Sequence, residues 1–478
     1  MRSSCLGALL LLASTAFGQS ALERIMAQSK VVVGGGIPLR LQEVLESVDR
    51  HYPPLLAALQ DRSLAQADLL AAQGRFDLTL RARVDTDRLG YYQNDRFDAG
   101  IEQPLGPGGI SLFSGWRLGE GLFAPYEGKL DTRSLGEFRN GIRIPLLRDR
   151  SIDPRRAELQ RASLGISVAD LGIDQQRLAI TQMATRRYWD WVAAGRRYAI
   201  ALAVLEIATI REKILEETVE AGQLPAIEVT DNKRAILQRQ SIVIETQRSL
   251  EQAAFELSLF LRDGQGQPLT PTVDRIPPEF PEAIAIEPDK LAADLRKALQ
   301  KRPEIARLAA QREQTEVEAK LARNQWLPAV DLLSSFNVEG GTGAVRRGPQ
   351  DLRTSLVIEL PFQRRQATAR FEASQARIRQ FTERERYARD QVATEVRDAA
   401  SAVNAAVQRV QVLRDEVQVS RELEEAERAR FELGEGTLFI LNLRELATAE
   451  AAIREVVSQA DYQRAVAQYE LATAQALR

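Results

Sequence analysis

Residues 392–417 read VATEVRDAASAVNAAVQRVQVLRDEV, and the spacing of their apolar residues predicts a coiled-coil helix. Apolar side chains recur in steps of four and three without a break, the heptad pattern of helices that pack along a shared seam. The seam residues are Val392, Val396, Ala399, Val403, Ala406, Val410, Leu413 and Val417. Neighbouring small or apolar residues such as Ala400 and Val407 widen the stripe, so we expect this helix to have partners on two sides.

The helical pattern around this stretch runs from about 364 to 433, and a second one of similar length covers 154–221. Asp153 is placed to act as the N-cap of the second helix, with Pro154 at its first position. About 70 residues at 1.5 Å each give a helix of about 105 Å. Helices of this length need neighbours along their whole length.

The same order of signals occurs twice: a helix, alternating strands, a very long helix, a sharp turn and another helix. We therefore divide the chain into a first repeat at 19–265, a linker at 266–288 and a second repeat at 289–478. The first repeat comprises a helix at 39–73, a strand region at about 76–147, the helix 154–221, a turn at 222–225 and a helix at 226–262. The second comprises a helix at 289–326, a strand region at 328–361, the helix 364–433, a turn at 434–437 and a helix at 438–477.

The strand regions alternate apolar and polar residues, as membrane barrels do and as half-exposed soluble sheets also do. In lipid every strand edge must be paired, so a chain with few strands has to close a barrel with further copies of itself. The first strand region also holds alternating segments at 97–105 and 110–118. These segments are either extra strands or extensions of a hairpin outside the membrane.

Composition excludes several classes of protein. The 478 residues carry 64 Lys and Arg against 66 Asp and Glu, which leaves no basic surplus for binding nucleic acid. One histidine, His51, and one cysteine, Cys5, cannot build a Cys/His zinc site, a catalytic triad or a disulfide. We therefore expect no enzyme activity, no metal site and no cofactor.

Residues 1–18 have the pattern of a secretory signal peptide: a positive start at Arg2, a short apolar run and the small-residue site Ala16-Phe17-Gly18. The apolar run is well short of the ~20 residues that a membrane span needs. Cleavage would leave an exported chain that starts near Gln19 and contains no cysteine.

The duplicated plan resembles that of the TolC-like outer-membrane efflux proteins. The likeness includes Arg302-Pro303-Glu304-Ile305 in the first helix of the second repeat, Leu327-Pro328 before its strands, and the two turns. The turns begin at Gly222, with Pro225, and at Gly434, with Gly436 and Thr437. They are similar to the family's turns, in which an acidic residue follows a glycine by six positions.

This resemblance implies an α+β membrane protein of the outer membrane, with long α-helical coiled coils and transmembrane β-strands. It implies a homotrimer in which each chain gives four strands to one 12-stranded barrel and its helices to a tunnel through the periplasm. The implied function is that of a passive exit duct in a tripartite efflux or type I secretion system. Its partners would be an inner-membrane pump, a periplasmic adaptor (membrane fusion) protein and outer-membrane lipid, with no nucleic acid.

The resemblance also implies a constriction or adaptor contact at the turns. Glu228 stands six residues after Gly222, whereas the same count from Gly434 reaches Ile440. Counting from Gly436 reaches Asn442, and Glu445 follows one helical turn later. Glu228, Asn442 and Glu445 are therefore the candidate constriction residues, with Glu445 preferred at the second turn and Asn442 as a neutral substitute.

The alternative function is a periplasmic coiled-coil adaptor or structural spacer without a pore. Such a protein would use the same helices, and its strand segments would form a small soluble sheet. The two copies of the helix-and-strand plan favour the channel, because an adaptor usually carries a single helical hairpin.

Overall fold

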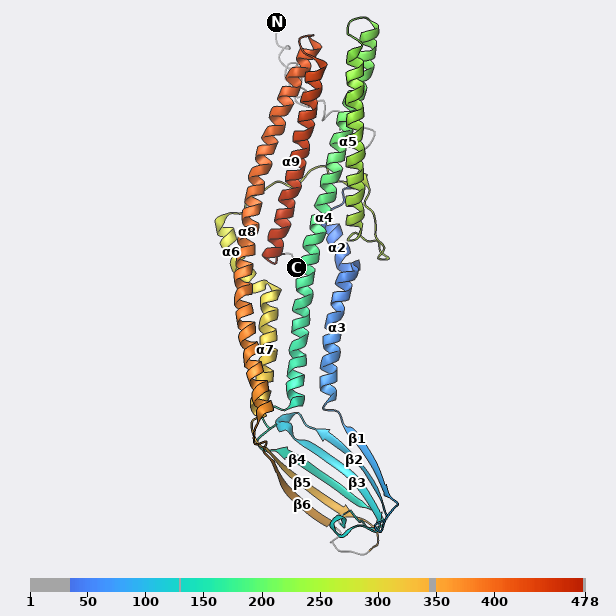
Figure 1. The fold of residues 1–478 in the computed structure, drawn as a ribbon, viewed down its shortest axis with the longest axis vertical. Helices are drawn as coiled ribbons and strands as arrows, with labels where there is room; N and C mark the ends of the chain where they lie inside the picture. Colours follow the sequence, from blue (N-terminus) through green and yellow to red (C-terminus); the bar gives the residue numbers. More distant parts are fainter. Residues whose placement is uncertain (1–34, 129, 344–349, 476–478) are drawn as a thin grey trace, which may run out of the picture. The chain divides into compact units, whose positions relative to one another are not determined.

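The computed structural model describes residues 35–128, 130–343 and 350–475, so the expected signal peptide at 1–18 lies outside the described residues. The chain, whose elements are labelled in Figure 1, divides into two compact units. Unit 1 comprises residues up to 57, 174–302 and 390 onwards, and unit 2 comprises 58–173 and 303–389. Each unit combines parts of both sequence repeats, because α4 (Pro154–Glu220) and α8 (Arg365–Glu432) each contribute to both.

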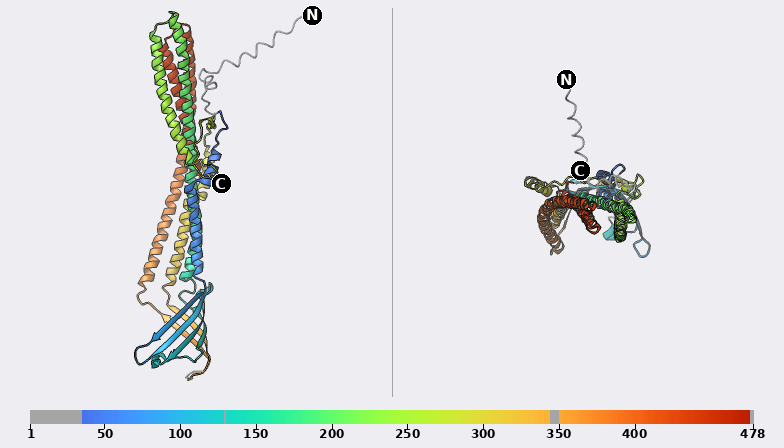
Figure 2. Two further views of the ribbon diagram at one scale, coloured as in Figure 1. Left: turned by 90° about the vertical axis from the view of Figure 1, so that its right-hand side faces the viewer. Right: turned by 90° about the horizontal axis from the view of Figure 1, so that it is seen from above.

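Unit 1 contains two helical hairpins. In the first, α4 turns into α5 (Ile227–Ser258), and in the second, α8 turns into α9 (Leu438–Ala472) (Figure 2). The predicted seam of α8 is confirmed, because Val392, Val396, Ala399, Val403, Val410 and Val417 are all buried. Two apolar clusters hold the unit, one around Trp191 and Leu257 and one around Val204 and Ala451.

The helices expected at 39–73 and 289–326 are each divided in two. The first comprises α2 (Leu41–His51) and α3 (Pro53–Gly74), and the second comprises α6 (Pro288–Lys301) and α7 (Pro303–Asn324). Tyr52 and Arg302 have extended backbone angles at the two breaks. Each precedes a proline, whose ring disfavours a helical conformation in the residue before it and which donates no backbone hydrogen bond.

Residues 266–288, expected as a linker, pack against the helices of unit 1. Ile276 is fully buried, and its side chain fills the space beside Gly195 of α4. The backbone N–H of Ile284 donates to the Tyr462 hydroxyl (2.9 Å), and that of Ile286 donates to Asn404 Oδ1 (2.7 Å). Ile276 and Ile286 of this connection are therefore part of the core.

Unit 2 contains a single antiparallel sheet in the order β1-β2-β3-β4-β5-β6. Its strands are β1 (Thr79–Asp87), β2 (Asn94–Pro104), β3 (Ser111–Gly121), β4 (Glu137–Pro145), β5 (Ala329–Glu339) and β6 (Gln350–Glu359). The segments expected at 97–105 and 110–118 form β2 and β3. The described residues thus form six strands, so the expected number of four strands is wrong.

The sheet joins the two repeats through β4 and β5, whose pairing runs from Glu137 opposite Glu339 to Pro145 opposite Asp331. The strands β1 and β6 are the two edges. Asp153 caps α4 as predicted, because its Oδ1 accepts from the backbone N–H groups of Arg155 (2.8 Å) and Arg156 (3.0 Å).

Candidate pore lining and hairpin-turn site

The sheet of unit 2 has one apolar and one charged face. Cross-strand partners share a face, so the pairs Val84 with Phe97 and Trp116 with Phe138 place one set of side chains together. The apolar face carries Leu80, Ala82, Val84, Phe97, Ala99, Ile101, Leu112, Trp116, Leu118, Phe138, Ile142, Ile144, Val330, Leu332, Phe336, Val338, Leu352, Leu356 and Ile358. Many of these are exposed in the single chain, including Leu80 (73%) and Leu352 (71%). An apolar surface of this extent marks an interaction with lipid or protein.

The opposite face carries most of the charge of the sheet, with Phe113, Leu333 and Val357 as its large apolar side chains. Its ionic groups pair with one another across the strands. Arg96 contacts Asp85 (2.6 Å), Arg139 contacts Asp98 (2.7 Å) and Arg143 contacts Asp331 (2.5 Å). Such a surface can line a water-filled space, because the charges remain solvated and neutralise each other.

The strand lengths and the free edges complete this arrangement. The six strands have 9 to 11 residues each, the length that crosses a bilayer when a strand is tilted. Side chains of β1 and β6 are exposed along almost the whole strand. Each edge therefore offers backbone N–H and C=O groups for pairing with another strand.

None of the described helices is long and apolar enough to cross a membrane.

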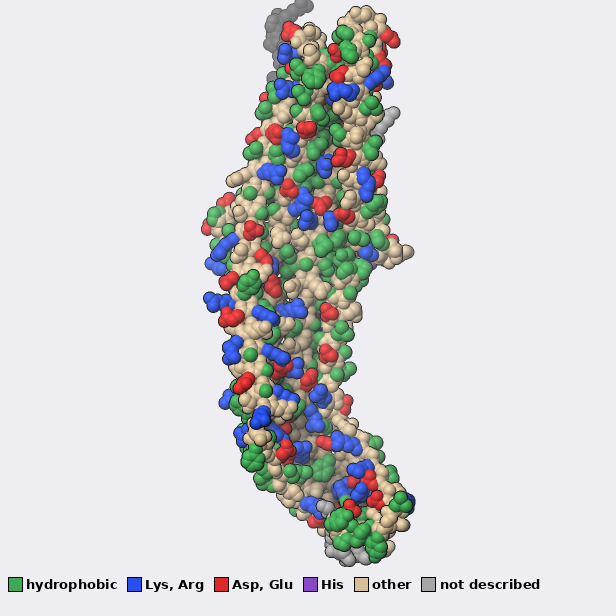
Figure 3. Space-filling model, viewed as in Figure 1, with side chains coloured by type: hydrophobic (Ala, Val, Ile, Leu, Met, Phe, Trp, Pro, Cys, Tyr) green, Lys and Arg blue, Asp and Glu red, His purple; other side chains and the backbone are tan. Residues whose placement is uncertain are grey.

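Within the described ranges, no group of three or more His, Cys, Asp and Glu residues could hold a metal ion. On the face shown in Figure 3, basic and acidic side chains are interspersed along the helices.

The two hairpin turns have nearly the same geometry. Gly222 (φ 73°) and Gly434 (φ 76°) occupy the left-handed region that favours glycine. The next residues close the helices, as Gln223 N–H donates to Thr218 O (3.1 Å) and Glu435 N–H to Arg430 O (2.9 Å). These are Schellman motifs, the standard end of a helix that must reverse direction.

The residues after the two glycines start the returning helices. Pro225 is exposed, and its carbonyl accepts from the backbone N–H of Glu228 (3.1 Å). At the second turn, Thr437 is the N-cap of α9 and its hydroxyl accepts from the N–H of Ile440 (3.4 Å). The positions singled out at both turns therefore build the reversal itself.

The three candidate constriction residues do not come together. Glu228 is half-buried in the first turn of α5, where an acidic side chain also suits the helix dipole. Asn442 and Glu445 lie one turn apart on α9 and contact the same arginines. Glu445 is only 2% exposed, which argues against a free carboxylate that faces a tunnel.

Glu445 is the centre of a buried ionic cluster that joins both hairpins. Arg211 of α4 and Arg239 of α5 donate to its two carboxylate oxygens, the latter at 2.9 Å. Arg428 of α8 lies 3.5 Å away and also contacts Glu424 (2.7 Å). Burial alone would raise the pKa of Glu445, but Arg211 and Arg239 outweigh it and hold the pKa below its usual value. Glu445 is therefore charged at neutral pH and binds three helices to α9.

The arginines of this cluster were not predicted from the sequence, although a signal for them exists. Buried positions of α9 follow steps of three and four through Leu438, Leu441, Glu445 and Thr448. Arg239 occupies a corresponding buried position of α5, seven residues after Asn232. A charged residue on each of two apolar seams predicts that the two residues pair in the core.

The comparisons with known proteins agree with this geometry. Residues 295–476 match the family model of the outer membrane efflux protein. Comparison with curated protein sequences finds no significant match.

Several solved outer-membrane proteins share the fold. The open-state MtrE outer membrane channel of Neisseria gonorrhoeae has a TM-score of 0.65 at 15% identity, with 91% of this chain and 88% of that chain covered. The outer membrane protein VceC of Vibrio cholerae has a TM-score of 0.63 at 16% identity, covering 91% and 95%. CusC has a TM-score of 0.66 at 13% identity, covering 92% and 93%.

The match of residues 295–476 and the shared fold confirm the predicted resemblance to the TolC-like efflux proteins. Residues 295–476 are thus similar to the outer membrane efflux protein family, and the chain as a whole has the fold of MtrE, VceC and CusC.

Proposed function

We propose that this protein is the passive exit duct of an efflux system. Three copies join their sheets into one barrel through the outer membrane and their helices into a tunnel through the periplasm. An inner-membrane pump supplies the energy, and a periplasmic adaptor connects the pump to the duct. The single observation that carries the proposal is the two-faced sheet of unit 2.

The apolar face of this sheet favours the duct over a soluble spacer. It extends over all six strands, and many of its large side chains are solvent-exposed in the single chain. A soluble periplasmic sheet would have to cover this face with protein, whereas lipid covers it without further elements. The charged face on the other side then lines a water-filled pore.

The free edges support an assembly of several copies. In lipid an unpaired strand edge is very unfavourable, so β6 of one copy is expected to pair with β1 of the next. Three six-stranded sheets give an 18-stranded barrel in place of the expected 12-stranded one. Barrels of about 16–18 strands leave an aqueous channel, which suits a duct for solutes.

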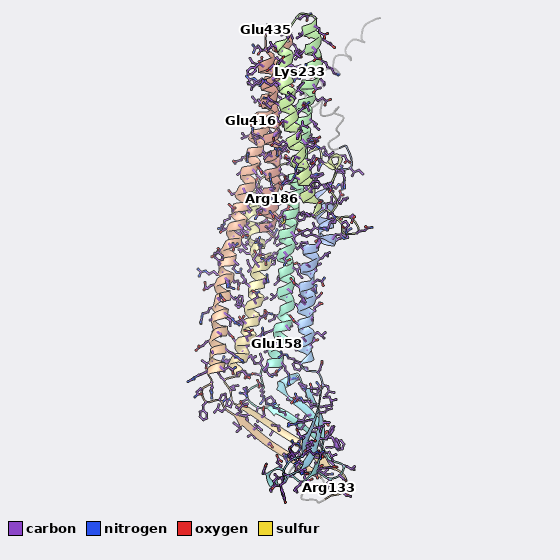
Figure 4. The ribbon with its side chains drawn as sticks, turned by 45° about the vertical axis from the view of Figure 1, so that its right-hand side comes forward. Arg133, Glu158, Arg186, Lys233, Glu416 and Glu435 are labelled. Carbon is purple, nitrogen blue, oxygen red and sulfur yellow. The ribbon has the colours of Figure 1, made fainter. Side chains whose placement is uncertain are left out.

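The hairpin turns offer the surface for the adaptor. Large apolar side chains are exposed on both sides of the turns, among them Leu433 (76%), Ile227 (67%) and Phe439 (62%). Charged side chains such as Lys233 and Glu435 lie close to the same turns (Figure 4). We propose that these exposed groups, together with Glu228, contact the adaptor or the neighbouring copies.

The ionic cluster around Glu445 provides a link between the hairpins. It joins α4 and α5 of the first hairpin to α8 and α9 of the second. Separation of the hairpins requires that these ion pairs break, in addition to the apolar contacts around Val204 and Ala451. The cluster is thus our candidate for the element that the adaptor and pump act on.

Cross-linking between copies tests the proposal. Cysteines at Arg83→Cys on β1 and Ser355→Cys on β6 both lie on the charged face near the two edges. The only natural cysteine is Cys5, in the expected signal peptide. A flexible bismaleimide added to membranes should yield covalent trimers from the double variant, whereas each single variant should yield none.

Imaging and conductance complete the test. Particles in mild detergent should show three-fold symmetry, and planar bilayers should show ion conduction. Monomeric protein in the soluble periplasmic fraction would contradict the duct and favour the spacer.

A further inference from the structure

Part of the segment between β3 and β4 lies over the charged face of the sheet. Gly119 shares that face with Arg117, as the alternation along β3 requires. A Cβ atom on Gly119 would collide with the carbonyl oxygen of Leu130 and would lie 3.2 Å from the ring of Phe123. Leu130 and Phe123 therefore lie over Gly119, on the side of the sheet that carries the ion pairs.

Residues 130–136, which we call the inner loop, contact two strands, β3 and β5. Thr132 exchanges hydrogen bonds with Gly119 of β3, its N–H donating to Gly119 O (3.2 Å) and its hydroxyl oxygen accepting from Gly119 N–H (3.0 Å). The Arg133 guanidinium lies 3.8 Å from the Glu339 carboxylate at the end of β5. These contacts join the inner loop to β3 and β5, the two strands that flank β4.

The inner loop also contacts a residue of the apolar face of the sheet. The Trp116 side chain donates from Nε1 to the carbonyl of Leu135 (2.8 Å). Gly136 has φ 76°, and a Cβ there would lie 2.6 Å from Trp116 Nε1. A glycine is therefore required at the point where the chain leaves the inner loop and enters β4.

Burial is uneven along the charged face of the sheet. Near the loop, Asn337 is 4% and Glu137 6% exposed. Away from it, the side chains of Arg81 and Arg353 are 75% and 51% exposed. The buried polar groups therefore lie at the end of the sheet where the Arg133 guanidinium approaches Glu339.

The inner loop lies at the end of the sheet opposite to the helices of unit 2, as Arg133 shows in Figure 4. The helices α3, α4, α7 and α8 all connect to the other end, near Thr79, Pro145, Ala329 and Glu359. If the charged face lines a pore that crosses the outer membrane, this end opens to the cell exterior.

We propose that the inner loop is a constriction at the outer mouth of the pore and sets the size of the solutes that leave it. The inference rests on the proposed function, because it requires the charged face to line the pore. Three inward loops, one from each copy, would narrow a barrel that its strand number alone leaves wide. Thr132, Arg133 and Gly119 are then the residues that position the constriction.

A reporter cysteine on the charged face, inside the outer opening of the pore, tests this proposal. The test does not depend on what the hairpin turns do. Ser335→Cys lies on the charged face, further from the outer end of β5 than Glu339. Maleimides of increasing polymer size are added to intact cells that carry the full chain. Leu89→Cys is the control reporter, because Leu89 is 97% exposed in the connection between β1 and β2 and should react with all sizes.

We expect a small maleimide to label Ser335→Cys and a large polymer maleimide to be excluded. Gly119→Val in the same background should displace the inner loop and raise the rate of labelling by the large reagent roughly tenfold. Arg133→Ala should act in the same direction and Arg133→Lys should retain the exclusion. Arg353→Ala removes an arginine from the same face away from the loop and should leave the exclusion unchanged.

The outcomes separate the two proposals. Rapid labelling of Ser335→Cys by the large reagent in the otherwise native chain would overturn the constriction and retain the pore. Complete protection from even the smallest reagent would overturn the pore itself. If the large reagent is still excluded in both Gly119→Val and Arg133→Ala, the inner loop does not set the size limit. If Gly119→Val does not assemble, the labelling of Arg133→Ala by the large reagent decides whether the inner loop sets the size limit.

Discussion

Glu445 and Arg239 form a buried ion pair, with 2.9 Å between carboxylate and guanidinium, that joins helices from the two sequence repeats. Their side chains are 2% and 5% exposed. Arg239 also donates to the backbone carbonyl of Val204 (2.9 Å), so its position is fixed from two directions. The pair directly connects the returning helices α5 and α9, and the stability of the hairpins in unit 1 depends on it.

Removal of this carboxylate should be strongly destabilising. Glu445→Ala leaves Arg239 buried without its charge partner, which costs about 3 kcal/mol in the free energy of unfolding. Thermal unfolding in detergent measures the loss. The matched control is Glu416→Ala, which breaks an exposed pair with Arg454 (2.7 Å) on α8 and α9 and should have little effect. Equal losses in the two variants would refute the special role of Glu445.

Glu445 also predicts that the thermal stability of the protein depends on pH. The folded-state pKa of Glu445 lies below its ordinary value of 4.5, so the carboxylate contributes stability above that pH. This contribution is lost as the pH falls through the lowered pKa. Unfolding temperatures measured from neutral pH to strong acid should therefore fall more steeply for the native chain than for Glu445→Gln. Parallel curves would show that Glu445 is not linked to folding in this range.

Replacement of either turn glycine should lower the free energy of unfolding, although no atom would obstruct a side chain at these positions. Gly222 and Gly434 have positive φ and nothing within 4 Å of the position that a Cβ atom would take, so alanine would be strained only by the backbone. We expect Gly222→Ala and Gly434→Ala each to lose about 1 kcal/mol. Gly264 has equally open space without a left-handed φ, and Gly264→Ala should be neutral. Chemical denaturation of the three variants checks the difference.

The two faces of β6 should respond oppositely to a charge. Leu356 lies on the apolar face and is 57% exposed, and Leu356→Arg should cost about 2–4 kcal/mol if that face meets the bilayer interior. Ser355, its neighbour in sequence, faces the other side, so Ser355→Arg should be tolerated. The yield of assembled protein in outer-membrane fractions is the measurement. Equal tolerance of both substitutions would mean that lipid does not cover the apolar face.

Sequence alone identified the features that depend on neighbours a few residues apart. The periodicity of residues 392–417 predicted the buried seam of α8, and Asp153 with Pro154 located the start of α4. Gly222 and Gly434 located both turns. These features follow from local rules, because helix periodicity, caps and left-handed glycines are decided within one or two turns of chain.

Only the tertiary structure decided which distant residues meet. Alternation at 97–105 could not distinguish a strand from an extension, since a strand is defined by its pairing, here of β2 with β1 and β3. Glu445 was expected in a tunnel, but it meets Arg211 and Arg239 more than 200 residues away in the chain. Local sequence does not show which residues will be such partners, because burial and pairing of a charge depend on how the helices pack against one another.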